Sequence, residues 1–341
     1  MEFVDVILLV AGFAVFQYVG IAVHEGGHLI AGLLSGYRFS LFRVLGFVWV
    51  KEDGKIVRRS SKNKLIAGQC LMAPPEDFKN FRYILYNFGG GLANLVLAAL
   101  CTVISFIWSS NEFVFMFFWG GAIANYLYAV LNMIPMYVGV PNDGMNAWKA
   151  WRGRTSGKGF YLLLKANHEL MEGKRYRDLD PEEFKLDPDA DLTNYMDVQS
   201  VFLEASYWYD RGEYQKSVST FSILDPSTLP QYYRNVIHGA FLYHAIVHEP
   251  YYEKAKSLYE EKGMAKLLSS GLPPLTRVLA AYEFFVLGNH EKGRKLAKKA
   301  KSDLENYENR GAVIMETDYH AELEAKMNLA ENPVTQRVDQ L

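Results

Sequence analysis

The chain has 341 residues, a formal net charge of −2 at pH 7 and 50% hydrophobic residues. Its length predicts about two folded units. The near-neutral charge excludes the strong excess of lysine and arginine that is typical of proteins that bind nucleic acids. The two cysteines, Cys70 and Cys101, form no closely spaced pair, so the sequence predicts neither a disulfide framework nor an oxidising compartment.

Three long apolar stretches, at about 3–34, 83–108 and 113–134, lie in the first part of the chain. Each has the roughly 20 residues needed to cross the hydrocarbon core of a bilayer. The first stretch lacks the basic start and the small-residue cleavage site of a signal peptide, so we expect it to be retained. Residues 1–150 are therefore predicted to form a membrane domain with three transmembrane helices.

Basic residues indicate the orientation of these helices. The segment 36–82 contains ten lysines and arginines, and four more follow the third span within 149–158. The other side of the membrane would carry Glu2, Asp5 and the short turn 109–112. The positive-inside rule then places the amino terminus outside and the carboxy-terminal half in the cytoplasm, and we expect a multi-pass protein of a bacterial cell membrane.

A metal-binding pattern lies inside the first apolar stretch, as His24-Glu25-Gly26-Gly27-His28. Two histidines four residues apart on a helix are separated by about 40° around the axis and about 6 Å along it, so both can bind one zinc ion. Glu25 would act as the general base of a zinc peptidase. The alternative is a chance match in which the three side chains satisfy one another, but such residues inside an apolar span usually mark a functional site.

A catalytic zinc ion usually has a third protein ligand. Between residue 82 and the end of the membrane half, the acidic residues are Glu112 and Asp143. Glu112 belongs to the outer turn, whereas Asp143 follows the third span on the inner side. This elimination favours Asp143 as the third ligand, and the alternative is an ordinary Asp-Gly turn at a helix end.

These residues resemble the site-2 protease family of intramembrane zinc metalloproteases. That family combines an HExxH helix with a later Asn-x-x-Pro segment and an Asp-Gly pair, which here are 132–135 and 143–144. The gap before Asp143 is longer than is usual in the family, and Pro141-Asn142 replaces the usual residue before the aspartate.

The resemblance also implies a role for Asn94. Family members carry Gly-Pro-x-x-Asn in the middle span, with an asparagine that contacts the substrate or the oxyanion, and this chain has Gly-Gly-Leu-Ala-Asn at 90–94. Asn94 is therefore expected to be catalytic, with Asn125 and Asn132 as weaker substitutes. The alternative is a helix interface of small residues with a buried amide.

A hairpin is predicted directly after the first span. Residues 39–50 are rich in valine, phenylalanine and leucine, a turn follows at 52–54, and an apolar run resumes at 55–57. In the resembled family, a hairpin at this position dips towards the membrane and an unwound substrate pairs with its edge. Phe47, Val48 and Trp49 would bind substrate there, or would rest on the bilayer surface if the hairpin is only amphipathic.

The carboxy-terminal half, 155–341, contains a repeat. The segments 213–217, 251–255 and 289–293 recur at a period of 38 residues, each after an apolar helical pattern, and a weaker copy lies near Tyr176. This resembles tetratricopeptide helical hairpins, whose usual period is shorter. We expect a cytoplasmic α-solenoid that binds a protein or peptide partner.

The predicted fold is thus all-α, with a three-helix membrane core, a small membrane-associated β-hairpin and a helical solenoid. The leading interpretation of function is a zinc endopeptidase that cleaves transmembrane or membrane-proximal substrates, with the repeats recruiting or gating them. The alternative is a catalytically silent membrane adaptor that binds partners through its repeats. A zinc transporter would need metal ligands on several spans, and the other two contain no acidic residue or histidine.

Overall fold

A computed structural model describes residues 3–52, 54–60 and 66–331, and the chain divides into two compact units. The predicted turn residue Asp53 and the basic residues Lys62 and Lys64 lie outside the described residues. The first unit runs to His168 and the second begins at Glu169. The described part is mostly helical, with 13 α-helices and a four-stranded antiparallel sheet, so the expected all-α class holds apart from that sheet.

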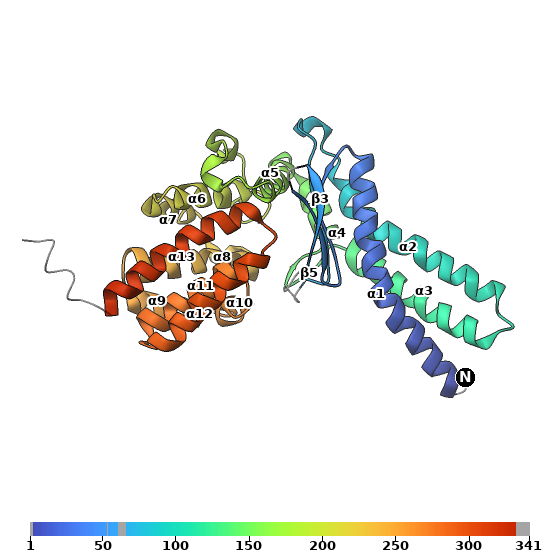
Figure 1. Ribbon diagram of the computed structural model, residues 1–341. Helices are drawn as coiled ribbons and strands as arrows, with labels where there is room; N and C mark the ends of the chain where they lie inside the picture. Colours follow the sequence, from blue (N-terminus) through green and yellow to red (C-terminus); the bar gives the residue numbers. More distant parts are fainter. Residues whose placement is uncertain (1–2, 53, 61–65, 332–341) are drawn as a thin grey trace, which may run out of the picture. The chain divides into compact units, whose positions relative to one another are not determined.

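Three helices of the first unit, α1 (Phe3–Leu34), α2 (Tyr83–Ile107) and α3 (Glu112–Met133), are long and apolar enough to cross a membrane. They pack against one another (Figure 1). Gly12 of α1 lies directly against the backbone of Phe117, where a Cβ atom would come within 1.9 Å of the carbonyl oxygen. Such close backbone approach is typical of helix packing in membranes.

The sheet contains β1 (Arg38–Val44), β2 (Phe47–Glu52), β3 (Lys55–Ser60) and β4 (Gly68–Ala73). The strand order is β3-β2-β1-β4, and all neighbouring strands are antiparallel. The predicted hairpin, 39–57, therefore forms three of the four strands, because a turn at Leu45 and Gly46 divides its first arm into β1 and β2. Because β2 is paired on both sides, the free edges belong to β3 and β4, and β4 packs against α1.

The chain after α3 turns sharply before it enters the next helix. Gly139, with φ +80°, joins the two-residue strands β5 (Tyr137–Val138) and β6 (Val140–Pro141). This left-handed conformation favours glycine. Helix α4 (Asp143–Arg152) follows, and the side chain of Asn142, the residue before it, caps the helix by accepting from the Met145 N–H.

Helix α5 (Arg154–Met171) belongs to the first unit up to His168. Tyr161 donates a hydrogen bond to the Glu76 carbonyl, and its ring packs on Phe78 and Phe81. The first unit therefore extends beyond residue 150, where the membrane domain was expected to end.

The second unit is built from paired helices. Their bounds are α6 (Gln199–Asp210), α7 (Tyr214–Phe221), α8 (Gln231–Tyr243), α9 (Tyr252–Glu260), α10 (Met264–Leu268), α11 (Pro273–Ala281), α12 (His290–Asp303) and α13 (Arg310–Glu331). The pairs α6–α7, α8–α9 and α11–α12 coincide with the three clear copies of the repeat. The weaker copy at Tyr176 forms only a short 3-10 helix, Tyr176–Asp178.

In two of these pairs, the first helix continues into a π-helical turn, which is His244–His248 after α8 and Tyr282–Val286 after α11. The apolar core of the second unit includes Leu242, Phe284 and, from α13, Leu323, all buried. Two buried ion pairs, Arg175–Asp210 and Arg277–Glu316, add polar contacts between segments that are distant in the sequence.

Candidate metal centre

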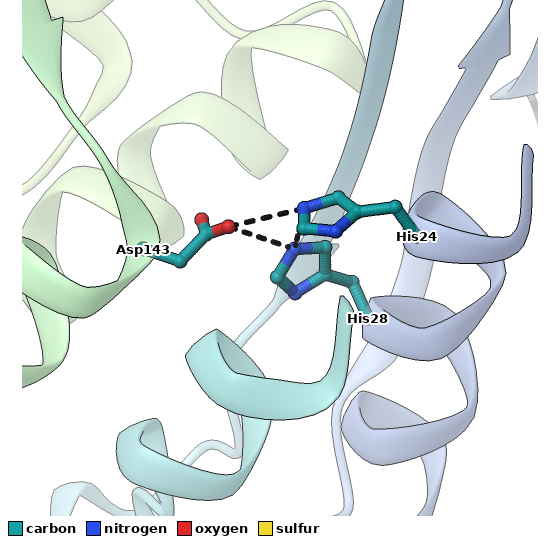
Figure 2. Close-up of side chains that lie close together, drawn as sticks. All are labelled: His24, His28 and Asp143. Atoms are coloured by element: carbon teal, nitrogen blue, oxygen red, sulfur yellow. Dashed lines mark hydrogen bonds and ion pairs between the residues drawn. The ribbon is translucent and has the colours of Figure 1, made fainter. Parts of the chain in front are cut away.

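Three side chains converge where α1 meets the start of α4 (Figure 2). The Nε2 atoms of His24 and His28 lie 3.1 Å apart. The nearer carboxylate oxygen of Asp143 lies 3.1 Å from His24 Nε2 and 3.3 Å from His28 Nε2. One helical turn thus supplies two imidazoles, and the first residue of another helix supplies the carboxylate.

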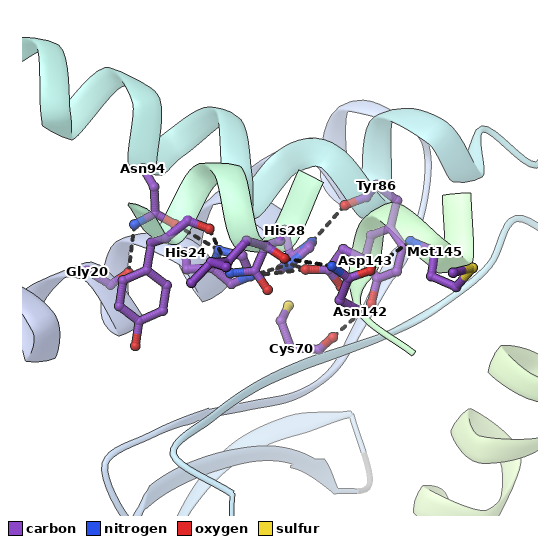
Figure 3. Close-up of polar contacts among 12 residues, drawn as sticks. Gly20, His24, His28, Cys70, Tyr86, Asn94, Asn142, Asp143 and Met145 are labelled. Carbon is purple, nitrogen blue, oxygen red and sulfur yellow. Dashed lines mark hydrogen bonds and ion pairs between the residues drawn. The ribbon is translucent and has the colours of Figure 1, made fainter. Parts of the chain in front are cut away.

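The other nitrogen of each imidazole has a partner that identifies the tautomer (Figure 3). His28 Nδ1 lies 2.7 Å from the carbonyl oxygen of Tyr86, which can only accept, so Nδ1 carries the proton. His24 Nδ1 lies 2.8 Å from Asn94 Oδ1 and likewise donates. Because Nδ1 is the donor in both rings, Nε2 is the atom of each ring that faces Asp143 and could bind a metal ion.

This arrangement fits a metal ion. The three facing atoms lie 3.1–3.3 Å from one another, so a single cation between them could contact all three. Two ligands of a tetrahedral zinc ion, each bound at about 2.0–2.1 Å, lie about 3.3 Å apart, which is close to the observed spacing. A histidine pair with both second nitrogens bonded to oxygen acceptors is the usual support of a zinc site.

Glu25 lies beside these ligands, in a cavity of about 580 Å³. The cavity is lined by the three ligands, Glu25 and nine further residues, namely Gly68, Gln69, Cys70, Tyr86, Leu131, Asn132, Val140, Pro141 and Asn142. The backbone of Cys70 hydrogen-bonds the Glu25 carboxylate. Glu25 and the three potential ligands therefore line the same space, which is large enough for a peptide segment.

Comparisons of the chain with protein-family models, with curated proteins and with solved structures give no match. Its function must therefore be inferred from the residues of this site and their geometry.

Asn94 does not lie where the resemblance implied, in contact with the substrate or the oxyanion. Its side chain is fully buried and does not line the cavity. Its amide donates to the Gly20 carbonyl and to Asn125 Oδ1, while its oxygen accepts from His24. Since all these groups are engaged, Asn94 orients His24 and has no free donor for an oxyanion.

We expect Asn94→Leu to weaken zinc binding about 10–100-fold, the usual cost of losing an outer-shell partner of a ligand. The matched control is Asn87→Leu, because Asn87 is also a buried amide of α2 but bonds only its own helix, at Tyr83. Zinc affinity can be measured by competition with a chelator. Unchanged affinity with a reduced kcat would instead place Asn94 in contact with substrate.

The predicted substrate-binding residues Phe47, Val48 and Trp49 are not brought to the cavity. Val48 is fully buried, and the half-exposed ring of Phe47 lies under Arg58 of the neighbouring strand. The sheet contributes β4 to the cavity in their place. Residues 68–70 carried no catalytic signature, so only the folded sheet reveals their position.

Asn142 is a further residue that the sequence did not single out. Its amide donates to the carbonyls of Leu131 and Ile134, and its oxygen accepts from the N–H groups of Met136 and Met145. These four bonds tie the end of α3 to the start of α4. They hold the adjacent Asp143 beside the histidines despite the long gap after Pro135.

Cys70 also faces this space, but it is a poor candidate ligand. Burial and the nearby Glu25 carboxylate raise the pKa of its thiol, which disfavours the thiolate that zinc requires. His24, His28 and Asp143 form the one group of potential metal ligands found in the described part of the chain.

Proposed function

We propose that this chain is an intramembrane zinc endopeptidase of the site-2 protease type. The observation that carries the proposal is the meeting of two imidazole nitrogens and one carboxylate beside a glutamate that follows His24 directly. That set matches the three protein ligands of a catalytic zinc site. Its location within a helix long and apolar enough to span a bilayer supports substrates in or near the membrane.

When bound, zinc supplies Lewis-acid chemistry, lowering the pKa of a water molecule to about 7 and polarising a carbonyl. Glu25 takes the proton of the attacking water and passes it to the departing amine of the cleaved peptide. The Cys70 backbone keeps the Glu25 carboxylate in place for both transfers. His24 and His28 keep their orientation through Asn94 and the Tyr86 carbonyl.

Substrate would enter as an extended strand beside β4, the sheet edge that lines the cavity. Strand addition satisfies the backbone groups of an unwound helix, which cannot remain unpaired in a bilayer. Gly68 leaves room above the base, because a Cβ atom there would lie 2.5 Å from Glu25 Oε1. Asn132 lines the same cavity, and its amide donates to the Tyr128 carbonyl.

The proposal includes a membrane topology and a recruiting domain. The basic residues of 36–82 and of α4 favour the cytoplasmic side for the sheet and the second unit, with the amino terminus outside. The helix pairs of the second unit carry no group of metal ligands among their described residues. A stacked solenoid of this kind would bind a protein substrate or a peptide partner.

Glu25→Gln tests this proposal, because it removes the base and leaves all three ligands. We expect the variant to bind one zinc ion per chain. Its cleavage rate should fall at least about 100-fold, because general-base catalysis is removed. Fragments of membrane proteins should be compared by mass spectrometry in cells that express wild type or variant. Glu112→Gln, at the first residue of α3, serves as the control.

Two results would contradict the proposal. Wild-type protein that binds no zinc would remove its chemical basis. Identical fragment patterns in wild type and Glu25→Gln, with partners still bound by the second unit, would support a catalytically silent adaptor.

A further inference from the structure

Helix α4 carries the ligand Asp143 at its first residue and an exposed aromatic and basic surface in its last turns. Trp148 and Trp151 are 37% and 67% exposed, large fractions for tryptophan. Arg152 is also exposed, so positions 148, 151 and 152 lie on one side of the helix, at the spacing of one turn. The opposite part of α4 packs against α2 and α3.

The basic side chains at the end of α4 and the start of α5 have no acidic partner in the part of the chain that the structure describes. Among the described residues, no ion pair with an acidic side chain is found for Lys149, Arg152 or Arg154. Lys149 and Arg152 instead lie over the ring of Trp148, at 5.7 and 5.0 Å from its centre. By contrast, Lys292 and Arg294 on the basic helix α12 are paired with acids.

Exposed apolar side chains also lie on the segment just before α4. The last turn of α3 and the residue after it expose Val130 and Ile134, both about half exposed. Tryptophan beside a span favours the headgroup level of a bilayer, and unpaired lysine and arginine there attract anionic lipids. The chemistry of this surface matches a phospholipid headgroup layer, with tryptophan rings at the boundary and cations towards phosphate.

We propose that α4 lies on the bilayer surface and binds anionic phospholipid headgroups through Trp148, Trp151 and Arg152, and that this contact holds Asp143 beside His24 and His28. The inference rests on the proposed function. A helix of ten residues is about 15 Å long and moves as a rigid body. The depth at which lipid holds its last turns therefore determines where the ligand at its first residue lies.

The lipid contact is tested with the full-length protein in nanodiscs of phosphatidylcholine, with or without brominated phosphatidylglycerol, which quenches nearby tryptophan. The chain has six tryptophans, so the signal of two is obtained by difference from Trp148→Phe/Trp151→Phe. We expect brominated phosphatidylglycerol to quench wild type more strongly than this variant, whereas Trp208→Phe in the second unit leaves the quenching of the remaining tryptophans unchanged. Equal quenching of wild type and the double variant would overturn the lipid contact. A protein partner on this surface would give that same result.

The coupling to the metal site is tested by zinc retention against a chelator in the same nanodiscs. Anionic lipid should slow zinc loss from wild type, and Lys149→Gln/Arg152→Gln should remove that dependence, with lipid selectivity falling on the order of fivefold for each cation removed. Lys295→Gln/Lys298→Gln on α12 removes the same charge elsewhere and should leave the dependence intact. Zinc retention that is independent of lipid composition would overturn the coupling.

Quenching at Trp148 and Trp151 in a protein that binds no zinc would support the surface contact and overturn the proposed function. Failure of the lipid contact and failure of the proposed function are therefore distinguishable.

Discussion

Asp143→Ala should weaken zinc binding by more than about 100-fold, because loss of a direct ligand costs more than loss of an outer-shell partner. The remaining imidazoles would still face each other at 3.1 Å, but without the anion that neutralises the ion. Zinc content per chain after dialysis against a weak chelator measures the effect. Proteolysis should disappear in parallel, since all the proposed chemistry occurs at this ion.

Glu76→Ala is the matched control for Asp143→Ala. Glu76 is an acidic residue of the same unit whose side chain is 85% exposed and pairs only with the exposed Arg38. Its removal should leave zinc binding unchanged. If Asp143→Ala kept full zinc content and full activity, the third ligand would have to be another group and the assignment of Asp143 would be wrong.

Gly90→Ala adds only one methyl group, but it should weaken zinc binding about as much as Asp143→Ala. A Cβ atom at Gly90 would lie 2.6 Å from His24 Cε1 and 2.6 Å from His28 Nε2, which is far inside van der Waals contact. Both imidazoles would have to rotate away from Asp143, because the neighbouring Gly89 is already packed against Gly27 and fixes the approach of the two helices. Zinc titration of the purified variant measures the loss.

Gly26→Ala makes the same chemical change on α1 and provides the control. Apart from the neighbouring backbone of its own helix, no described heavy atom lies within 4 Å of a Cβ atom built at Gly26. Alanine is also the better helix former, by up to about 1 kcal/mol in a soluble helix. We therefore expect this variant to bind zinc like wild type and to resist thermal unfolding at least as well. Normal zinc binding by Gly90→Ala would show that α2 can withdraw from the site without cost.

The amino-acid sequence by itself determined the features that depend on local backbone geometry. The four-residue spacing of His24 and His28 places both side chains on one face of any helix, and the apolar lengths of the three stretches predict three helices of that length. The repeat period predicted the helix pairs of the second unit. These properties follow from the pitch and rise of a helix and need no knowledge of which segments touch.

Only the tertiary structure decided how the site is completed. Asp143, 119 residues after His24, reaches the histidines because Asn142 ties the end of α3 to α4. Asn94 proved to be a partner of His24, and the cavity is lined by β4 rather than by Phe47–Trp49, because the sheet order buries β2 between two other strands. These contacts depend on how closely glycine lets helices approach and on which strands pair, and neither is encoded in the spacing of residues along the chain.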